Sequence, residues 1–503
     1  MIMQETNNEP CAVGGLVLLE RCLSQPTFDR KAFENRLRER LLERHVRFRS
    51  IVLGDSHFVD IGAQAVEMEN HLKYATLPMN SGKGKSEDEV LSSFVESRLF
   101  KPFTKVSKTV SGNDAIPLWE CIVIENYSRG LICFFRIHHW IGDGTLLQKI
   151  IVCDLLDDEQ NIHNFIEKST SMRGSHSNWT SALAIINSLV MWCRNNIPLI
   201  GSLIGTVVGF ILKVISFVLT FFLIGYIGFT KDGDSIFKVS PKNKKSGQIS
   251  CSFIWFNDTE QDCNSEDDLR NETDRYFTVD EFKRVAKQMG GTFNDLFLTL
   301  LSGGADRYRL KLCKKNKSSD ELLNTCNARI GMGVNIRSDE SKQEHGNIVG
   351  VIFSSIPLNV KFINDPSSRF DSVKAHMNFS KFLPQPYFNR YLLWLGTMFL
   401  PRKLAVSLMN WGASSTTFTC SNVQGVSLPD DETISFKLLG HNMLQGAGFI
   451  PLVAAVGVNC TVLSFNNRVG LTVVSDKAMV EDSHLFAECI REEFQSIRKF
   501  LSQ

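Results

Sequence analysis

Residues 131–155 combine a strand pattern and a helix pattern across one short turn, and this junction limits the possible folds most. Residues 131–137 are β-branched and aromatic, which predicts a buried strand. Apolar residues follow helical spacing after Gly144, at Leu146, Leu147, Ile150, Ile151 and Leu155. The turn between them reads His138-His139-Trp140-Ile141-Gly142-Asp143-Gly144. Such a junction holds a side chain rigidly and leaves its tip open to a cleft.

The turn places an imidazole where a catalytic base would lie. A histidine with a pKa of about 6.5 is largely neutral at cytosolic pH, so it can accept a proton. Two adjacent histidines could also simply end a strand. Gly142, Asp143 and Gly144, at set offsets from the pair, favour the catalytic interpretation.

The string His-His-x-x-x-Asp-Gly resembles the active-site motif of the wax ester synthase/diacylglycerol acyltransferase family. It resembles more distantly the motif of peptide-synthetase condensation domains and of chloramphenicol acetyltransferase. Other segments, from about residue 40 to the C-terminal region, resemble the first family and not condensation domains. They are Pro117-Leu118-Trp119-Glu120, Asn294-Asp295, Gly346-Asn347 with the later Ile356-Pro357-Leu358, and Ser421-Asn422-Val423-Gln424-Gly425, in which Gln424 replaces a proline.

Strands and helices are mixed in both halves of the chain, which predicts an α/β protein. We expect helices at 33–42 and 484–501, a helix from Thr278 to Gly290-Gly291, a hairpin of 119–125 with 131–137, an edge strand at 46–53, and strands at 249–256, 348–358, 415–424 and 453–474. A chain of 503 residues is too long for one hydrophobic core, which suggests two domains or more. The resemblance implies two chloramphenicol acetyltransferase-like sandwich domains that face each other across a tunnel, at 1–185 and 249–503.

The resemblance implies that the protein is an acyl-CoA-dependent O-acyltransferase. It would transfer a fatty acyl group to a long-chain alcohol, giving a wax ester, or to diacylglycerol, giving triacylglycerol. Such a transfer needs a base and oxyanion donors, with acyl-CoA as a substrate and neither a metal nor a cofactor. A condensation-type amide-forming enzyme, which would need a carrier protein, and a membrane-tethered scaffold without activity are the alternatives.

The roles of the motif residues follow from the same resemblance. His139 matches the second histidine of the motif and would be the general base, which then protonates the thiolate of coenzyme A. His138 would support the turn or line the acceptor side. Gly142 and Gly144 allow the turn and a close approach of substrate. The chain has no Gly-x-Ser-x-Gly element, so direct transfer is favoured over an acyl-enzyme.

Five residues elsewhere are candidate substrate contacts, each with a structural alternative. Asp295, beside Asn294, would shape the acyl-CoA tunnel or cap a helix begun by Thr292. Ser421 and Asn422 would donate hydrogen bonds to the carbonyl oxygen or the coenzyme, or form an ordinary turn. Trp119 would contact substrate or anchor the core.

Asp143 is expected to have a structural role, with its carboxylate turned away from the cleft. A buried carboxylate needs a partner, and a bidentate arginine is the best one. Residues 45–49 resemble the His-x-x-Leu-Arg segment of condensation domains, in which the final arginine pairs with the motif aspartate. Arg49 matches that position and is the first candidate, with Arg337 as the second.

Residues 197–229 are almost continuously apolar and exceed the ~20 residues that a spanning helix needs. A single span would place the two halves on opposite sides of the membrane, which an active site built from both halves forbids. We therefore expect residues 186–248 to form a membrane-associated segment and linker, re-entrant or lying in the interface. An apolar linker packed on the protein is the alternative.

Composition restricts the partners and the compartment. The net charge of +1 gives no nucleic-acid signature, so nucleic acid is not expected to bind. The 13 cysteines include no Cys-x-x-Cys pair, so neither disulfides nor a zinc site are expected. These features fit the cytosolic face of the endoplasmic reticulum membrane or a lipid droplet. The preferred acceptor, the chain length and the oligomeric state stay open.

Overall fold

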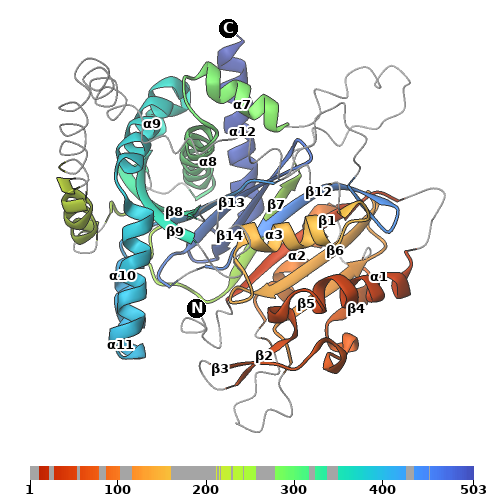
Figure 1. Cartoon of the computed structure of the whole chain (residues 1–503). Coiled ribbons are helices and arrows are strands. Elements are labelled where there is room, and N and C mark those ends of the chain that lie inside the picture. Colours follow the sequence, from red (N-terminus) through yellow and green to blue (C-terminus); the bar gives the residue numbers. More distant parts are fainter. Residues whose placement is uncertain are drawn as a thin grey trace, which may run out of the picture.

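Two six-stranded β-sheets form the centre of the molecule (Figure 1). They are seen in a computed structural model, which describes residues 11–21, 28–53, 57–78, 86–101, 103, 116–159, 162, 211, 214–215, 217–227, 230, 232–241, 243–255, 278–316, 323–336, 349–425, 436–452 and 454–502. The mixture of strands and helices confirms the predicted α/β class.

The first sheet combines strands from both ends of the chain. Its order is β11-β12-β1-β6-β5-β4, with bounds Lys437–Leu438, His441–Phe449, Ala12–Leu19, Leu131–His138, Trp119–Ile124 and Leu72–Ala75. Neighbouring strands are antiparallel except β4 and β5, and the antiparallel pairing of β5 with β6 confirms the predicted hairpin. Because β11 and β12 belong to residues 249–503, the predicted domain boundary does not fully separate the two sheets.

The second sheet is built from the C-terminal half alone. Its order is β7-β14-β13-β10-β8-β9, with bounds Ile249–Trp255, Arg468–Asp476, Val458–Phe465, Phe418–Val423, Cys326–Asn335 and Val349–Leu358. Strand β10 is parallel to both β13 and β8, and the other pairs are antiparallel. The strands predicted in this half are confirmed, and 453–474 contains the antiparallel pair β13 and β14.

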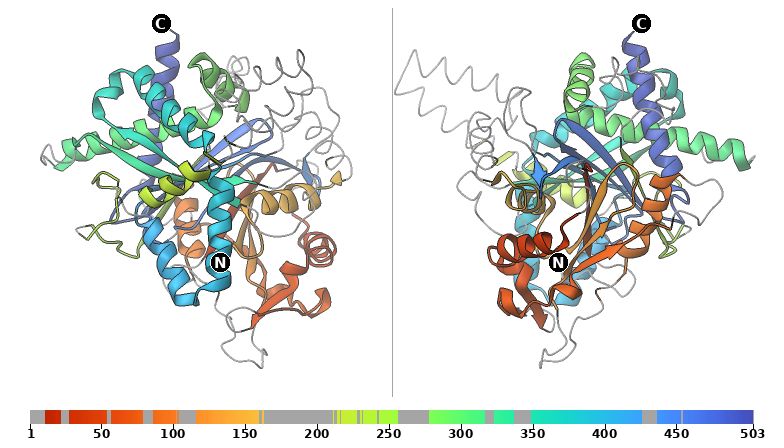
Figure 2. Two further views of the ribbon diagram at one scale, coloured as in Figure 1. Left: turned by 60° about the vertical axis from the view of Figure 1, so that its left-hand side comes forward. Right: turned by 90° about the vertical axis from the view of Figure 1, so that its right-hand side faces the viewer.

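Helices cover both sheets (Figure 2). The second sheet carries α7 Val279–Gln288, α8 Phe293–Asn316, α9 Pro366–Phe382 and α12 Ser483–Leu501. One face of the first sheet carries α1 Arg30–Arg36, the helical turn Leu37–Leu42, and α3 Gly144–Lys149 with its continuation Ile150–Asp154. The predicted helices are confirmed, and the Thr278 side chain accepts from the Glu281 amide at 3.0 Å, as the capping pattern requires.

A shared core joins the two halves. Helix α2, Glu87–Leu99, covers the other face of the first sheet and also packs on β7. Leu91 and Val95 of this helix share one apolar cluster with Cys251 and Phe253 of β7. Because apolar burial is the main stabilising contribution, this cluster fixes the two sheets relative to each other.

The predicted edge strand at 46–53 is wrong in its first half. Val46–Arg49 form a 3-10 turn, and only β2, Ser50–Leu53, is extended, where it pairs with β3, His57–Asp60. In a strand, residues two apart point to the same face. In a 3-10 helix they are rotated by about 240°, so Arg47 and Arg49 point in different directions.

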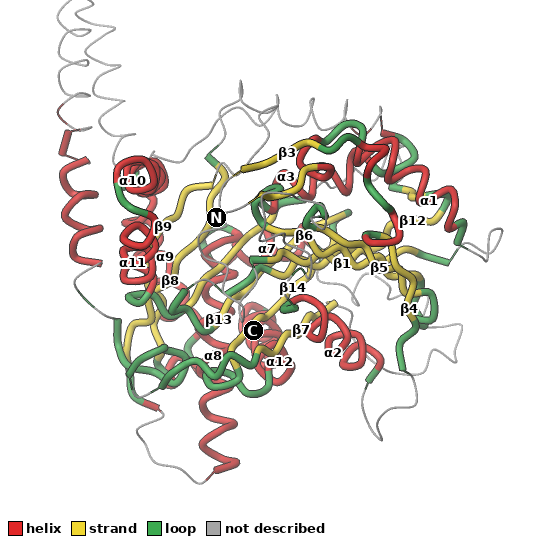
Figure 3. The backbone as a smooth tube through the Cα atoms, turned by 90° about the horizontal axis from the view of Figure 1, so that it is seen from below, coloured by secondary structure: helices red, strands yellow, loops and turns green. Residues whose placement is uncertain are grey.

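The apolar segment 197–229 lies partly outside the described residues. Its described part, between residues 211 and 227, is helical and lies beside α10, Gln385–Phe399, and near α11, Arg402–Ala413 (Figure 3). The rings of Phe217 and Phe221 contact Phe388 of α10, with centroids 5.1 and 6.3 Å apart. Among the described helices, none combines the length and the apolar character needed to cross a membrane.

Candidate active site

The histidine turn is held on several sides by backbone hydrogen bonds. Strand β6 ends at His138, whose amide donates to the Leu118 carbonyl at 2.9 Å. The amide of His139 donates to the Cys11 carbonyl of the neighbouring strand segment at 2.8 Å. The predicted strand, turn and helix are confirmed. Hydrogen bonds to the chain segments on both sides fix the position of the start of the turn.

Asp143 fixes the other end of the turn. Its side chain accepts from the Leu146 amide at 3.0 Å and caps α3, and its residue is buried. Close packing leaves little room for a side chain at the two flanking glycines. A Cβ on Gly142 would lie 3.1 Å from Leu146, and one on Gly144 would lie 3.2 Å from Val423 of β10. The motif therefore sets both the start of α3 and its contact with the second sheet.

His139 lies in the lining of a pocket between the two sheets. Burial lowers the pKa of the His139 imidazole, and the charge of His138 lowers it further. The carboxylate of Asp143 acts in the opposite direction and raises this pKa. A lowered pKa keeps the ring neutral near pH 7, which is the form that accepts a proton. Geometry and electrostatics thus both suit His139 to act as a base.

His138, the second residue predicted to be catalytic, has a structural position. Its side chain is fully buried and does not belong to the lining of that pocket. Its Nδ1 accepts the backbone N–H of Trp140 at 3.2 Å, and its ring lies against Phe103. The ring therefore supports the turn from inside, in agreement with the first of its two expected roles.

The predicted Arg49–Asp143 ion pair is wrong. Arg49 forms a bidentate pair with Asp60 at 2.9–3.1 Å and donates to the carbonyls of Leu42 and Glu43. The cation beside Asp143 is Arg47, whose guanidinium pKa is lowered by burial and raised by the Asp143 charge. The 3-10 turn explains this exchange, because it directs Arg47 and not Arg49 toward the motif. Arg337 lies outside the described residues.

Two predicted substrate contacts from distant segments meet each other. The side-chain amide of Asn422, in β10, donates to the side-chain oxygen of Asn294, in α8, at 2.7 Å. Their neighbour Val423 lines the pocket beside Gly144. Ser421 lies two residues before Val423 on the same strand and is half-buried. The second half of the chain thus reaches the histidine turn through the end of β10.

Asp295 caps its own helix, the structural alternative predicted for it. Its carboxylate accepts from the Thr292 amide at 2.8 Å and from the Thr292 hydroxyl at 2.7 Å, and it pairs with Lys381 at 3.3 Å. The side chain is buried. These contacts support the cap, and the substrate contact of Asp295 stays a prediction. Gly346-Asn347 lie outside the described residues.

Trp119 is a core residue, the structural alternative predicted for it. Its indole N–H donates to the Phe48 carbonyl at 2.7 Å, and its ring stacks on His71 with centroids 4.5 Å apart. The residue is buried in the cluster under α1 and α3. The one polar group of the indole ring, its N–H, is hydrogen-bonded inside the protein. The ring therefore anchors the core.

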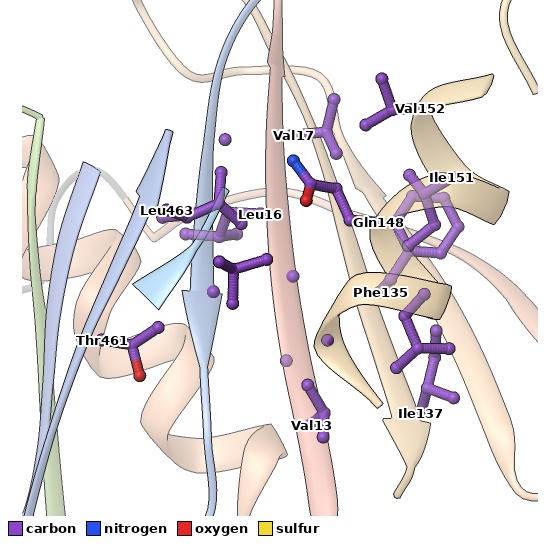
Figure 4. Close-up of a pocket in the computed structure, with 18 of the residues that line it drawn as sticks. Val13, Leu16, Val17, Phe135, Ile137, Gln148, Ile151, Val152, Thr461 and Leu463 are labelled. Atoms are coloured by element: carbon purple, nitrogen blue, oxygen red, sulfur yellow. The ribbon is translucent and has the colours of Figure 1, made fainter. Parts of the chain in front are cut away.

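The pocket that His139 lines is almost entirely apolar (Figure 4). The space inside it amounts to about 730 Å³, part of which is open to solvent. The lining comes from β1, β6, α3 and its continuation on one side, and from the ends of β10, β12 and β13 on the other. An apolar pocket beside a neutral base can hold a hydrocarbon chain with its reactive end at the imidazole.

Sequence reasoning missed the strands that form the floor of this pocket. β1 and β12 contribute Val13, Gly15, Val17, Gly446 and Gly448 to the lining. Glycines interrupt both segments, which weakens the strand pattern on which the prediction depends. The signal that could have found β1 was the run Ala-Val-Gly-Gly-Leu-Val-Leu-Leu itself, since paired glycines in an apolar run indicate a close approach of backbone or ligand.

Known proteins resemble the chain in sequence and in fold. The family of the WS/DGAT C-terminal domain matches residues 345–498. No curated protein sequence matches the chain. In structure, the wax ester synthase/diacylglycerol acyltransferase from Marinobacter aquaeolei VT8 aligns over 99% of this chain and 97% of its own, with a TM-score of 0.55 and 13% sequence identity. This likeness shows a shared fold.

Two peptide-synthetase domains also align. The starter condensation domain of rhizomide synthetase covers 99% of this chain and 90% of its own, with a TM-score of 0.47 and 8% identity. The EpoB NRPS cyclization-docking bidomain from Sorangium cellulosum covers 98% of this chain and 81% of its own, with a TM-score of 0.49 and 10% identity.

Proposed function

We propose that this chain, a member of the wax ester synthase/diacylglycerol acyltransferase family, transfers a fatty acyl group from acyl-CoA to a long-chain alcohol or to diacylglycerol. The activity class, an acyltransferase, follows from the family. The observation that carries the finer proposal is the position of His139 in the lining of an almost entirely apolar pocket. A hydrocarbon substrate in this pocket would present its polar end to the base.

The reaction needs one base that later acts as an acid. Neutral His139 takes the proton of the acceptor hydroxyl while the hydroxyl oxygen attacks the thioester carbonyl carbon. The tetrahedral intermediate then collapses, the carbon–sulfur bond breaks, and the imidazolium returns its proton to the thiolate of coenzyme A. The lowered pKa of His139 favours this second transfer, because it makes the imidazolium a stronger acid.

The intermediate carries a negative oxygen that needs donors. Ser421 lies on the β10 strand next to the histidine turn, with a half-buried hydroxyl, and Asn422 follows it. We assign Ser421 as the first candidate donor, because it is two residues from Val423 and strand residues two apart share a face. Asn422 is held by Asn294 and would position the strand.

The test uses the purified full chain with labelled palmitoyl-CoA and either hexadecanol or diacylglycerol, followed by separation of the lipids. We expect an ester product with at least one acceptor, and a loss of about 100-fold or more in the His139→Ala variant. A product formed equally fast by His139→Ala would contradict the assigned base.

The same assay separates the two alternative functions. A condensation-type enzyme would give no ester, and would form an amide when a long-chain amine replaces the alcohol and a carrier protein presents the acyl group. A scaffold without activity would give neither product while still binding membranes. The carbon skeletons of the alcohol and the amine are identical, so the comparison isolates the attacking atom.

The proposal includes a membrane surface as partner, on the cytosolic side of the endoplasmic reticulum or on a lipid droplet. Large apolar side chains are exposed on the described helical residues of 211–227 and on the neighbouring α10 and α11, among them Phe217, Phe222, Trp394, Phe399 and Trp411. Residues 385–413 contain no Asp or Glu but contain Arg390, Arg402 and Lys403. Aromatic side chains with basic residues and no acidic ones suit the interface of an anionic bilayer.

Flotation with vesicles of phosphatidylcholine, with and without phosphatidylserine, tests this surface. We expect Trp394→Glu and Phe399→Glu to reduce vesicle binding several-fold. Phe500→Glu, an exposed aromatic position at the end of α12, is the matched control and should bind like the unaltered protein. Equal binding by all variants would remove α10 from the proposed surface.

A further inference from the structure

Phe58 is a partly exposed aromatic residue, yet its ring has a fixed partner beside the base. It lies in β3 of the small two-stranded sheet, which belongs to neither six-stranded sheet (Figure 1). The Phe58 ring stacks on Trp140 with centroids 4.4 Å apart and ring planes at 26°. Phe58 is 48% exposed, whereas Trp140 is only 7% exposed. Phe58 therefore covers one face of the Trp140 indole on the solvent side.

The pairing of the small sheet directs the Phe58 ring inward. Phe58 pairs with Val52 of β2, and directly opposite residues of an antiparallel pair share one face. Val52 is buried in the same apolar cluster as Trp140. Val59, the next residue of β3, lies on the other face and is 40% exposed. A two-stranded hairpin is marginally stable alone, so its contacts with this cluster hold it in place.

Trp140 is held by hydrogen bonds at its backbone and by packing at its side chain. Its backbone N–H donates to Nδ1 of His138 at 3.2 Å, and its carbonyl accepts from Arg47 at 2.9 Å. The indole N–H is buried and finds no hydrogen-bond partner among the residues that the structure describes. A ring without such a bond is oriented by the groups that pack against it. The Phe58 stack therefore contributes directly to the orientation of the indole.

The orientation of Trp140 matters because the base immediately precedes it. His139 and Trp140 share one peptide unit, which is planar and rigid. A tilt of Trp140 therefore turns the backbone of His139 and moves its imidazole in the pocket. Misplacement of a reacting group by about 1 Å can slow a reaction ~100-fold. A small hairpin outside the pocket thus acts on the geometry inside it.

We propose that Phe58 is a positioning residue of the transfer reaction, because its ring holds Trp140 and thereby fixes the imidazole of His139 toward the pocket. Phe58 itself belongs neither to the pocket lining nor to the histidine turn. The inference rests on the proposed function for the reaction that His139 carries out. It adds a side chain from a separate sheet to the support of the base, beside the backbone contact of Arg47.

Three substitutions of Phe58 separate the ring stack from general packing. Phe58→Ala removes the ring, Phe58→Leu keeps apolar volume without a ring, and Phe58→Tyr keeps the stack. Val59→Ala is the matched control, because it truncates the neighbouring exposed residue on the opposite face of the same strand. Thermal unfolding of the four variants checks that each one folds.

Steady-state kinetics with palmitoyl-CoA and the better acceptor measures the effect. We expect Phe58→Ala to lower kcat about 5-fold and Phe58→Leu about 3-fold, with KM within about 2-fold, because a misplaced base slows the chemical step and leaves substrate contacts intact. Phe58→Tyr and Val59→Ala should keep the unaltered kcat. The inference would be overturned by an unchanged kcat in Phe58→Ala, by a loss in KM alone, by equal losses from Phe58→Ala and Val59→Ala, or by full activity of Phe58→Leu.

Nuclear magnetic resonance of the histidine rings tests the contact without turnover. The full chain is labelled with carbon-13 in the rings of its 11 histidines, and His139→Ala identifies the His139 signal by its loss. We expect this signal to shift or broaden in Phe58→Ala and to stay in place in Phe58→Tyr and Val59→Ala. This pattern would support the inference even if no ester is formed. An unmoved His139 signal in Phe58→Ala would refute it, even if the enzyme is active.

Discussion

The guanidinium of Arg47 donates to the backbone carbonyl of Trp140 at 2.9 Å, across 93 positions of sequence. A longer contact of 3.4 Å joins it to the carbonyl of Ile141. Both carbonyls lie inside the histidine turn. Burial lowers the pKa of the Arg47 guanidinium, and the nearby Asp143 charge opposes part of that fall. One cation from the 3-10 turn therefore holds the backbone between His139 and α3.

Replacing Arg47 is expected to slow the reaction more than it weakens substrate binding. Arg47→Met removes a charged donor from the turn, which corresponds to about 2 kcal/mol, or roughly 30-fold in kcat. The control is Arg49→Met, since Arg49 bonds to Asp60 outside the turn. Steady-state kinetics with both variants measures the effect. Equal losses from the two variants would deny Arg47 a specific positioning role.

Removing the Asp143 charge is expected to move the acid limb of the pH profile. Asp143→Asn keeps a residue that caps helices well, so α3 should persist. The charge of Asp143 raises the His139 pKa, while burial lowers it. Without that charge the pKa should fall further, and kcat/KM should stay high to a lower pH than in the unaltered protein. A shift of the limb to higher pH would contradict this electrostatic account.

The Asn294–Asn422 hydrogen bond is expected to couple the two halves of the site. Asn422→Ala should lower kcat/KM and the thermal stability together, because the bond joins β10 to the start of α8. The double variant with Asn294→Ala should lose about 1 kcal/mol less than the sum of the single losses. Strictly additive losses would mean that the contact contributes nothing of its own.

A buried ion network under α8 should be sensitive to the loss of one arginine. Arg369 and Asp306 are fully buried and pair at 2.9 Å, and Arg369 also faces Glu493 at 3.6 Å. Arg369→Met leaves buried carboxylates with less compensation and should cost about 3–5 kcal/mol. The exposed pair of Arg38 and Glu34 supplies the control, since Arg38→Met should change the melting temperature little.

The protein should lose stability between pH 6.5 and about 4 through His71. Burial lowers the pKa of this side chain from 6.5 to about 4. Between these pH values His71 binds a proton in the unfolded chain but stays neutral in the folded chain. The free energy of unfolding therefore falls by up to about 3 kcal/mol as the pH drops. Calorimetry at several pH values should show a smaller fall in His71→Gln. An identical fall would assign the effect to other groups.

Local pattern was sufficient for the elements that carry the chemistry. The β-branched run before His138, the helical spacing after Gly144 and the offsets between them determine a strand, a turn and a helix with His139 at the turn. The strand, the turn and the helix each depend on residues that are close in the sequence, so a local pattern is enough to predict them. The cap at Asp295 is equally local, because Thr292 and Asp295 satisfy each other across one helical turn.

Pairing across long distances was decided only by the tertiary structure. The sequence pointed to Arg49 as the partner of Asp143, whereas the structure places Arg47 there, because a 3-10 turn and a strand direct the same side chains differently. It also gave no sign that β12 would return to the first sheet beside β1, because register between strands depends on the burial of whole faces. The pocket floor that β1 and β12 form together exists only in that pairing.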